Sequence, residues 1–130
     1  MEAWTDGYIE LEIHDDTKLV RQKRTAKQYE SVAVLQSSTR QLVERMRGVS
    51  RGEYCLLHDI RSARGRAEPD FEAAIVREVA SMSDGFKRLA VLVATQVGRL
   101  QVKRLRPSAD RQAVRIFLDE SEALQWLREP

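Results

Sequence analysis

The chain opens with two segments whose apolar and polar positions predict a β-hairpin. Residues 8–14 alternate strictly, with aliphatic side chains on one face and mostly charged ones on the other, which is typical of a half-buried strand. Two aspartates and a threonine supply the turn, and residues 18–24 predict the returning strand. Opposite charges on facing strands would stabilise this pairing by up to about 1 kcal/mol per pair. The expected partners are Glu10 and Glu12 on the first strand with Arg21 and Lys23 on the second.

Four later segments carry apolar residues at the spacing of a helix. The first begins after Ser31, a good N-cap, and ends at Gly48, which we expect in the left-handed conformation. The second begins at Pro69, whose missing N–H costs nothing in a first turn, and ends at Gly85. The last of the four opens with the Asp-x-x-Glu form of a capping box. The third and fourth segments are residues 96–105 and 119–127.

Three short apolar runs separate these helices. Residues 54–60 and 89–94 show little polar alternation, as expected of central parallel strands that are covered on both faces. Residues 114–117 predict a last, shorter strand. Strands that alternate with helices indicate right-handed crossovers and a mostly parallel sheet. The prediction is therefore one α/β domain over residues 1–130, with a sheet of about five strands, an N-terminal antiparallel hairpin and four helices.

Composition and charge narrow the class of protein. The 130 residues, 42% of them hydrophobic, suit one compact core. The 22 basic and 20 acidic residues leave a net charge of +2, which is not the concentrated basic footprint of a nucleic-acid binder. With Cys55 as the single cysteine, and two histidines, neither an intrachain disulfide nor a structural zinc site is expected.

The chain also lacks the patterns that direct a protein to a membrane. No apolar run approaches the roughly 20 residues of a membrane span. The N-terminal residues lack the basic and then apolar order of a signal peptide. We therefore expect a cytoplasmic protein without a membrane span.

The strongest candidate for a functional surface is the strand–loop–helix step over residues 54–71. Open α/β sheets bind their ligands at loops that follow the carboxyl ends of strands. His58 and Asp59 are adjacent, but neighbours on a strand point to opposite faces, so they do not form a catalytic dyad. We interpret the step as a docking surface for a protein partner. Its candidate residues are His58, Asp59, Arg61, Ser62, Arg64, Arg66, Glu68 and Asp70.

Three arginines give this loop a second interpretation, as an anion site. Arg61, Arg64 and Arg66 directly precede a helix N-terminus, whose backbone N–H groups can receive an anion. The loop lacks the Gly-Lys-Ser/Thr of a P-loop and the Gly-x-Gly-x-x-Gly of a dinucleotide site, so no cofactor is expected. The alternative is a solvated loop whose arginines pair with the neighbouring carboxylates.

A second basic surface falls on the third predicted helix. Its cations lack the aromatic neighbours that stack on bases, so nucleic-acid binding is not expected, and Leu100 alone is a poor membrane wedge. The ordinary interpretation is a solvated helix face. The cations of this face are Arg99, Lys103 and Arg106, and the residues expected to face inward are Val97, Gly98, Val102 and Leu105.

Three stretches of the chain resemble the STAS domain. They are Leu57-His-Asp-Ile60, Phe86-Lys-Arg-Leu-Ala-Val-Leu-Val93 and the tail from Val114 to Leu127. They are most similar to small stand-alone bacterial SpoIIAA-like proteins, which are often grouped with STAS and CRAL-TRIO folds. The likeness covers nearly the whole chain. Its most specific part is the tail, a short strand followed by Asp-Glu-x-Glu-Ala-Leu-x-Trp-Leu.

The resemblance implies a regulatory or scaffold module that acts without catalysis. In STAS anti-anti-sigma factors, a kinase docks at the N-terminus of the helix after the strand that here ends at Asp59, and it phosphorylates a serine or threonine there. This chain departs from that pattern, because its helix opens with Glu68-Pro69-Asp70 and the loop hydroxyl, Ser62, lies several residues earlier. The residues therefore do not support a phosphorylation switch of that kind.

Two classes of function follow from these observations. The first is protein–protein interaction through the loop and the helix after the central strand, with self-association as one form of it. The alternative is binding of a small apolar or lipid-like ligand between a helix and the sheet, in a cavity lined by residues such as Phe71, Ile75 and Leu100. An enzyme ranks third, because the sequence shows no nucleophile–base pair, metal cluster or cofactor motif.

Overall fold

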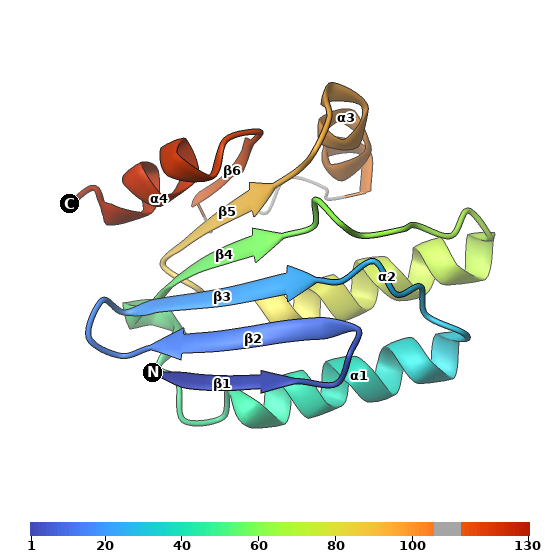
Figure 1. Ribbon diagram of the computed structural model, residues 1–130, viewed down its shortest axis with the longest axis horizontal. Coiled ribbons are helices and arrows are strands. Elements are labelled where there is room, and N and C mark those ends of the chain that lie inside the picture. The colour runs from blue at the N-terminus through green and yellow to red at the C-terminus, as the bar shows by residue number, and fades with distance from the viewer. Residues whose placement is uncertain (106–112) are drawn as a thin grey trace.

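The computed structural model describes residues 1–105 and 113–130 of the chain (Figure 1). Arg106, one of the cations expected on the basic helix face, lies outside the described residues. The elements are, in chain order, β1 (Glu2–Thr5), β2 (Ile9–His14), β3 (Leu19–Arg24), α1 (Val32–Arg45), the short 3-10 helix η1 (Arg51–Glu53), β4 (Cys55–Asp59), α2 (Pro69–Ser83), β5 (Arg88–Leu92), α3 (Gln96–Leu105), β6 (Ala113–Phe117) and α4 (Glu120–Arg128).

The strands of the described chain form one mixed sheet in the order β1-β2-β3-β4-β5-β6. The first three strands pair antiparallel, and β3 to β6 pair parallel. The predicted α/β architecture, with its N-terminal hairpin and four helices, is confirmed. The sheet has six strands where about five were expected, because β1 was missed. This edge strand is only four residues long and mostly exposed, so it produces no alternating pattern.

The predicted charge pairing across the hairpin is confirmed by the strand register. Glu10 lies opposite Lys23, and Glu12 lies opposite Arg21. Arg21 has a further partner, because its Nη2 lies 3.3 Å from Oε1 of Glu120 at the start of α4. The hairpin is therefore tied to the C-terminal helix as well as closed on itself.

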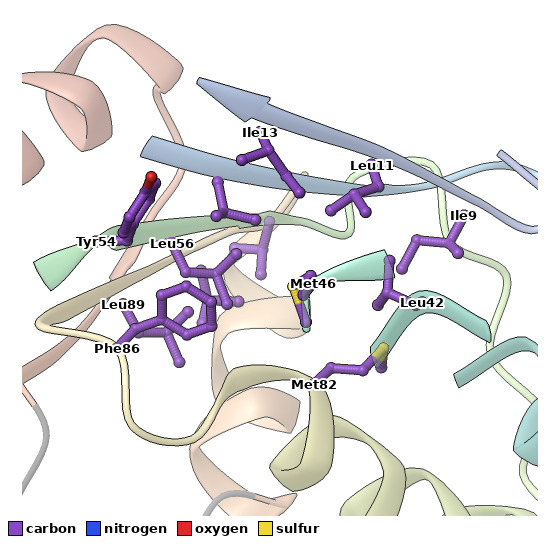
Figure 2. Close-up of a cluster of buried hydrophobic side chains, with 13 residues drawn as sticks. Ile9, Leu11, Ile13, Leu42, Met46, Tyr54, Leu56, Met82, Phe86 and Leu89 are labelled. Atoms are coloured by element: carbon purple, nitrogen blue, oxygen red, sulfur yellow. The ribbon is translucent and has the colours of Figure 1, made fainter. Parts of the chain in front are cut away.

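The larger core fills the space between the sheet and the helices α1 and α2 (Figures 1 and 2). Leu42 and Met46 of α1 and Met82 of α2 meet side chains that the strands direct toward them. Those strand side chains include Ile9, Leu11, Ile13, Leu56 and Leu89.

A second, smaller core lies on the other face of the sheet, under α4. Leu57 of β4 packs there with Ala90 and Leu92 of β5 against Trp126 and Leu127. Its neighbour in sequence, Leu56, belongs to the larger core, so β4 is covered on both faces, as its apolar run predicted.

The helix ends follow the sequence signals at most positions. Ser31 Oγ accepts a hydrogen bond from Val34 N at 3.1 Å, and Asp119 Oδ1 accepts one from Glu122 N at 3.1 Å, so both predicted N-caps are confirmed. Gly85 follows α2 with a φ of +87°, where a side chain would be strained.

The prediction for the end of α1 is wrong in one respect. Gly48 does not adopt a positive φ, which among the described glycines occurs at Gly7 and Gly85. The helix ends earlier, at Arg45, with Met46 as its C-cap. Two short-range hydrogen bonds follow the helix, from Arg47 N to Glu44 O and from Val49 N to Met46 O. They satisfy backbone carbonyls at the helix end, so a glycine in the left-handed conformation is not needed there.

Candidate functional site

Residues 60–68 form an irregular loop between β4 and α2 at the carboxyl edge of the parallel strands (Figure 1). The loop begins with a turn closed by a 3.1 Å hydrogen bond from Ala63 N to Ile60 O. Such a loop has few backbone hydrogen bonds of its own, so its shape depends on hydrogen bonds from side chains. Two arginines, one at each end of the loop, donate these hydrogen bonds.

Arg61 anchors the start of the loop. Its Nε and Nη2 donate to the two oxygens of Asp59 at 3.0 and 2.8 Å, and its backbone N donates to Oδ1 at 3.0 Å. Nη2 also donates to Oε1 of Glu120 in α4 at 2.9 Å. Burial alone would raise the pKa of the Asp59 carboxyl, but the hydrogen bonds and charge of Arg61 outweigh it and hold that pKa below its ordinary value.

Arg66 anchors the end of the loop. Its Nη1 donates to the carbonyl oxygens of Tyr29 and Glu30, both at 3.0 Å, and its Nη2 donates to Oε1 of Glu68 at 2.9 Å. The guanidinium carbon also lies 4.2 Å from the centre of the Phe71 ring, close enough for a cation–π contact. One side chain therefore joins the loop, the segment before α1 and the first turn of α2.

The segment before α1 is itself held rigidly. The rings of Tyr8 and Tyr29 stack with their centres 4.9 Å apart, and Lys27 and Arg24 cap the two outer ring faces. Gln28 Nε2 then donates to Gly65 O at 3.1 Å, which adds a second link to the loop. An open, largely polar hollow lies at this junction. It is lined by Gln28, Gly65, Arg66, Ala67 and Glu68.

His58 and Asp59 contact different layers of the molecule, as the strand geometry predicted. His58 is 4% exposed, and its Nδ1 lies 3.2 Å from Oε1 of Gln22 on the α1–α2 side of the sheet. Asp59, also 4% exposed, points to Arg61 and the start of α4. Both residues were predicted as docking residues, and both lie beneath the surface of the loop. Asp59 supports the start of the loop through its hydrogen bonds with Arg61.

Gln22 is the partner that sequence reasoning missed. It is fully buried on β3, and its Nε2 donates to Met46 Sδ and to Met82 O, both at 3.2 Å. Gln22 is two positions after Val20, so it lies on the same buried face of β3. The alternation of the strand could therefore have shown that this amide side chain points inward. No pattern pointed to its partner in β4, because that contact spans 36 positions.

The other predicted docking residues lie on the surface. Ser62, Arg64, Glu68 and Asp70 are exposed, and among the described residues Arg64 makes no hydrogen bond or ion pair. Glu68 is the N-cap of α2 but directs its carboxylate to Arg66. Because Arg61 and Arg66 already bind carboxylates of this chain, Arg64 is the one of the three arginines whose charge faces solvent. Anion binding stays a prediction.

The predicted orientation of α3 is correct at Gly98 and Val102, which face the protein, and wrong at Val97 and Arg99. Val97 was expected inside and is 66% exposed, whereas Arg99 was expected outside and is half-buried. Val102 does pack against the larger core, as expected, and Lys103 is exposed. In the last turn of α3, Arg104 forms a 3.1 Å ion pair with Glu72 in the first turn of α2.

The residues proposed to line an apolar ligand cavity do not meet in one place. Phe71 is buried in a cluster with Tyr29 and Leu35, and Ile75 packs against that cluster. Leu100 is 65% exposed on α3 and is not part of it.

Two further features bear on the class of protein. In residues 1–105 and 113–130, no group of three His, Cys, Asp or Glu side chains is arranged to hold a metal ion. No helix in that part of the chain is long and apolar enough to cross a membrane.

The fold is similar to one solved in crystals. The match is an uncharacterized protein from the DUF3478 family with a SpoIIAA-like fold, from Shewanella loihica PV-4, with a TM-score of 0.66. The two chains are 20% identical, and the match covers 98% of each. No protein-family model and no curated protein matches the chain.

The class of molecule follows from these findings. The chain has a SpoIIAA-like α/β fold, as the resemblance of its strands and tail to STAS domains predicted. At 20% identity the likeness is one of fold.

Proposed function

We propose that this protein is a non-enzymatic regulatory or scaffold module that binds a protein partner through residues 60–68 and the first turn of α2. One observation carries the proposal. Arg61 and Arg66 fix both ends of an otherwise irregular loop, and Ser62, Arg64 and Gly65 are exposed between them. A loop that is already ordered loses little conformational entropy when it binds, so its contacts contribute more fully to affinity.

The non-enzymatic part of the proposal rests on the placement of the candidate groups. His58, the imidazole nearest the loop, is buried against Gln22. Asp59 is engaged by Arg61, whose hydrogen bonds lower its pKa and so oppose a role as a proton donor. Ser62, the loop hydroxyl, is exposed and lies beyond both groups in the chain.

The alternative of an apolar ligand gains no specific support. Phe71 and Ile75 are packed with Tyr29 and Leu35 in a cluster of buried side chains. The hollow at the loop is lined mainly by polar and charged residues, which suits a docking surface better than a lipid-like ligand.

The proposal is tested by isolating the protein from the organism that encodes it and measuring its mass under native conditions. We expect a complex with a protein partner at fixed stoichiometry. Arg64→Glu should weaken that complex about tenfold or more, because it reverses the exposed charge at the centre of the loop.

Arg40→Glu is the matched control, since Arg40 is an exposed arginine on α1, away from the loop. A complex that is equally stable in both variants would contradict docking through this loop. A stoichiometric apolar small molecule in place of a partner would favour the ligand-binding alternative.

A further inference from the structure

α3 presents its aliphatic side chains to solvent. Val97 and Leu100 are 66% and 65% exposed, and Gln101 and Arg104 are exposed with them. These four residues follow one another at helical spacing and form one face, here called the α3 stripe. The opposite face, with Gly98, Arg99 and Val102, is turned toward the protein.

This orientation is costly for an isolated domain. The two aliphatic side chains remain in water, while Arg99 is half-buried, with an Nε that is buried and has no hydrogen-bond partner among the described residues. A rotation that exchanged the two faces would bury the aliphatic residues and release the arginine. It would also break the ion pair between Arg104 and Glu72.

The charge around the stripe indicates what can cover it. The described helix α3 has three basic residues and no acidic one. Lys103, next to the stripe, makes no ion pair or hydrogen bond within the described chain, and Arg104 closes the end of the stripe nearest α2. A second copy of α3 would therefore bring like charges together, which opposes self-association through this face.

We propose that the partner bound by this protein lays an acidic amphipathic helix along the α3 stripe. The aliphatic residues of that helix would pack on Val97 and Leu100, and its carboxylates would pair with Lys103 and the free edge of Arg104. The inference rests on the proposed docking function and extends it. The docking surface would then run from the loop 60–68 through the first turn of α2, across the Glu72–Arg104 pair, to α3.

A membrane surface fits the stripe less well. Interfacial helices usually insert aromatic side chains with a broad aliphatic face, and the stripe offers two aliphatic residues and no aromatic one.

The test uses a synthetic helical peptide of about four turns, with leucine along one face and glutamate on the others. The control peptide has lysine in place of each glutamate. Each is titrated into the full-length ¹⁵N-labelled protein while amide shifts are followed. We expect saturable shifts in α3 and the first turn of α2 with the acidic peptide only.

Protein variants separate the stripe from the rest of the surface. Val97→Ser with Leu100→Ser should weaken binding of the acidic peptide about tenfold, which is about 1.4 kcal/mol. Val76→Ser is the matched control, because Val76 is an exposed aliphatic residue on α2 outside the stripe. Its affinity should equal that of the unchanged protein.

Several results would overturn the inference. They are an absence of saturable shifts up to about 1 mM peptide, equal binding of both peptides, and an affinity that the double serine variant leaves unchanged. Binding to phosphatidylserine vesicles without binding to peptide would assign the stripe to a membrane instead. Peptide shifts confined to residues 60–68 would remove α3 from the surface and leave docking through the loop in place.

Discussion

At the scale of single residues, one ion pair connects the central strand to the surface of the molecule. Asp59 ends β4 and is almost fully buried, and Arg61 covers it with three hydrogen bonds. The same guanidinium reaches Glu120 of α4. A carboxylate in this position is costly without its partner, so the start of the loop has little freedom to move.

The first prediction concerns this carboxylate. Asp59→Asn should lower the free energy of unfolding at pH 7 by about 1–2 kcal/mol, because charge-assisted hydrogen bonds are lost while the guanidinium regains water. The folded-state pKa of Asp59 lies below the unfolded value near 3.8, so its contribution is fully present above that value. It is lost as the pH falls through the lower folded-state pKa.

The measurement is urea unfolding of both proteins at a series of pH values. The difference between the unchanged protein and Asp59→Asn should therefore shrink as the pH falls below about 3.8. Glu129→Gln, at an exposed carboxylate, is the control and should show no comparable difference at pH 7. A constant difference between Asp59→Asn and the unchanged protein down to the lowest pH would sink this account.

Single residues also show what the sequence could not reveal. The opposed directions of His58 and Asp59 followed from strand geometry alone, and the structure places them in different layers. The contact of Gln22 with His58 could not be predicted in the same way. A polar residue on an apolar strand face breaks the pattern, and the pattern does not identify its partner. Long-range hydrogen bonds leave no local pattern.

At the scale of elements, α2, the loop before it and the segment before α1 behave as one unit. Arg66 joins all three, through the carbonyls of Tyr29 and Glu30 and the carboxylate of Glu68. A lysine has the same charge but cannot donate to several acceptors in fixed directions.

The second prediction tests this unit. Arg66→Lys should leave the protein folded but speed amide hydrogen exchange in residues 62–68 and 27–30, because the loop loses its directional anchor. Mass spectrometry of exchange at neutral pH measures this directly. Arg64→Lys is the matched control and should exchange as the unchanged protein does, since Arg64 has no partner among the described residues. Equal protection of the loop in both variants would show that other contacts fix it.

The helices differ in how well the sequence placed them. α2 was predicted closely, because Pro69 and Gly85 mark its ends and its apolar stripe is broad. α3 was predicted at the right position, with Gly98 and Val102 correctly facing inward and Val97 and Arg99 wrongly placed. Its apolar residues are few, and its contact with α2, from Arg104 to Glu72, joins residues 32 positions apart. A weak periodicity leaves the rotation of a helix poorly determined, and contacts of that range leave no local pattern.

At the scale of the whole molecule, helices pack on both faces of the sheet, and residues 60–68 connect the two helical layers. α1 and α2 cover one face of the sheet, and α4 covers the other over β4, β5 and β6 (Figure 1). The sequence predicted that both faces of β4 are covered, because a strand buried on both sides is apolar at consecutive positions, as Leu56 and Leu57 are, but it did not assign the helices to the faces. It did not predict β1, whose exposed edge position leaves no pattern.

The two layers meet at Arg61, which connects the loop of the first layer to Glu120 of α4. Trp126 holds α4 on the sheet. The centre of its ring lies 5.7 Å from that of Phe117 and 5.5 Å from the guanidinium carbons of both Arg88 and Arg115. An effect on α4 should therefore reach residues 60–68, the proposed docking loop, through Glu120.

The third prediction follows from this connection. Trp126→Ala should lower the free energy of unfolding by about 3 kcal/mol, since it leaves a cavity over the smaller core. It should also speed hydrogen exchange at residues 60–64, because α4 no longer holds Glu120 in place for Arg61. Glu120→Gln separates the two effects: we expect faster exchange in the loop with little change in stability, because this ion pair is partly exposed. If the loop kept its protection in both variants, the coupling between α4 and the docking surface would be wrong, and the two layers would act independently.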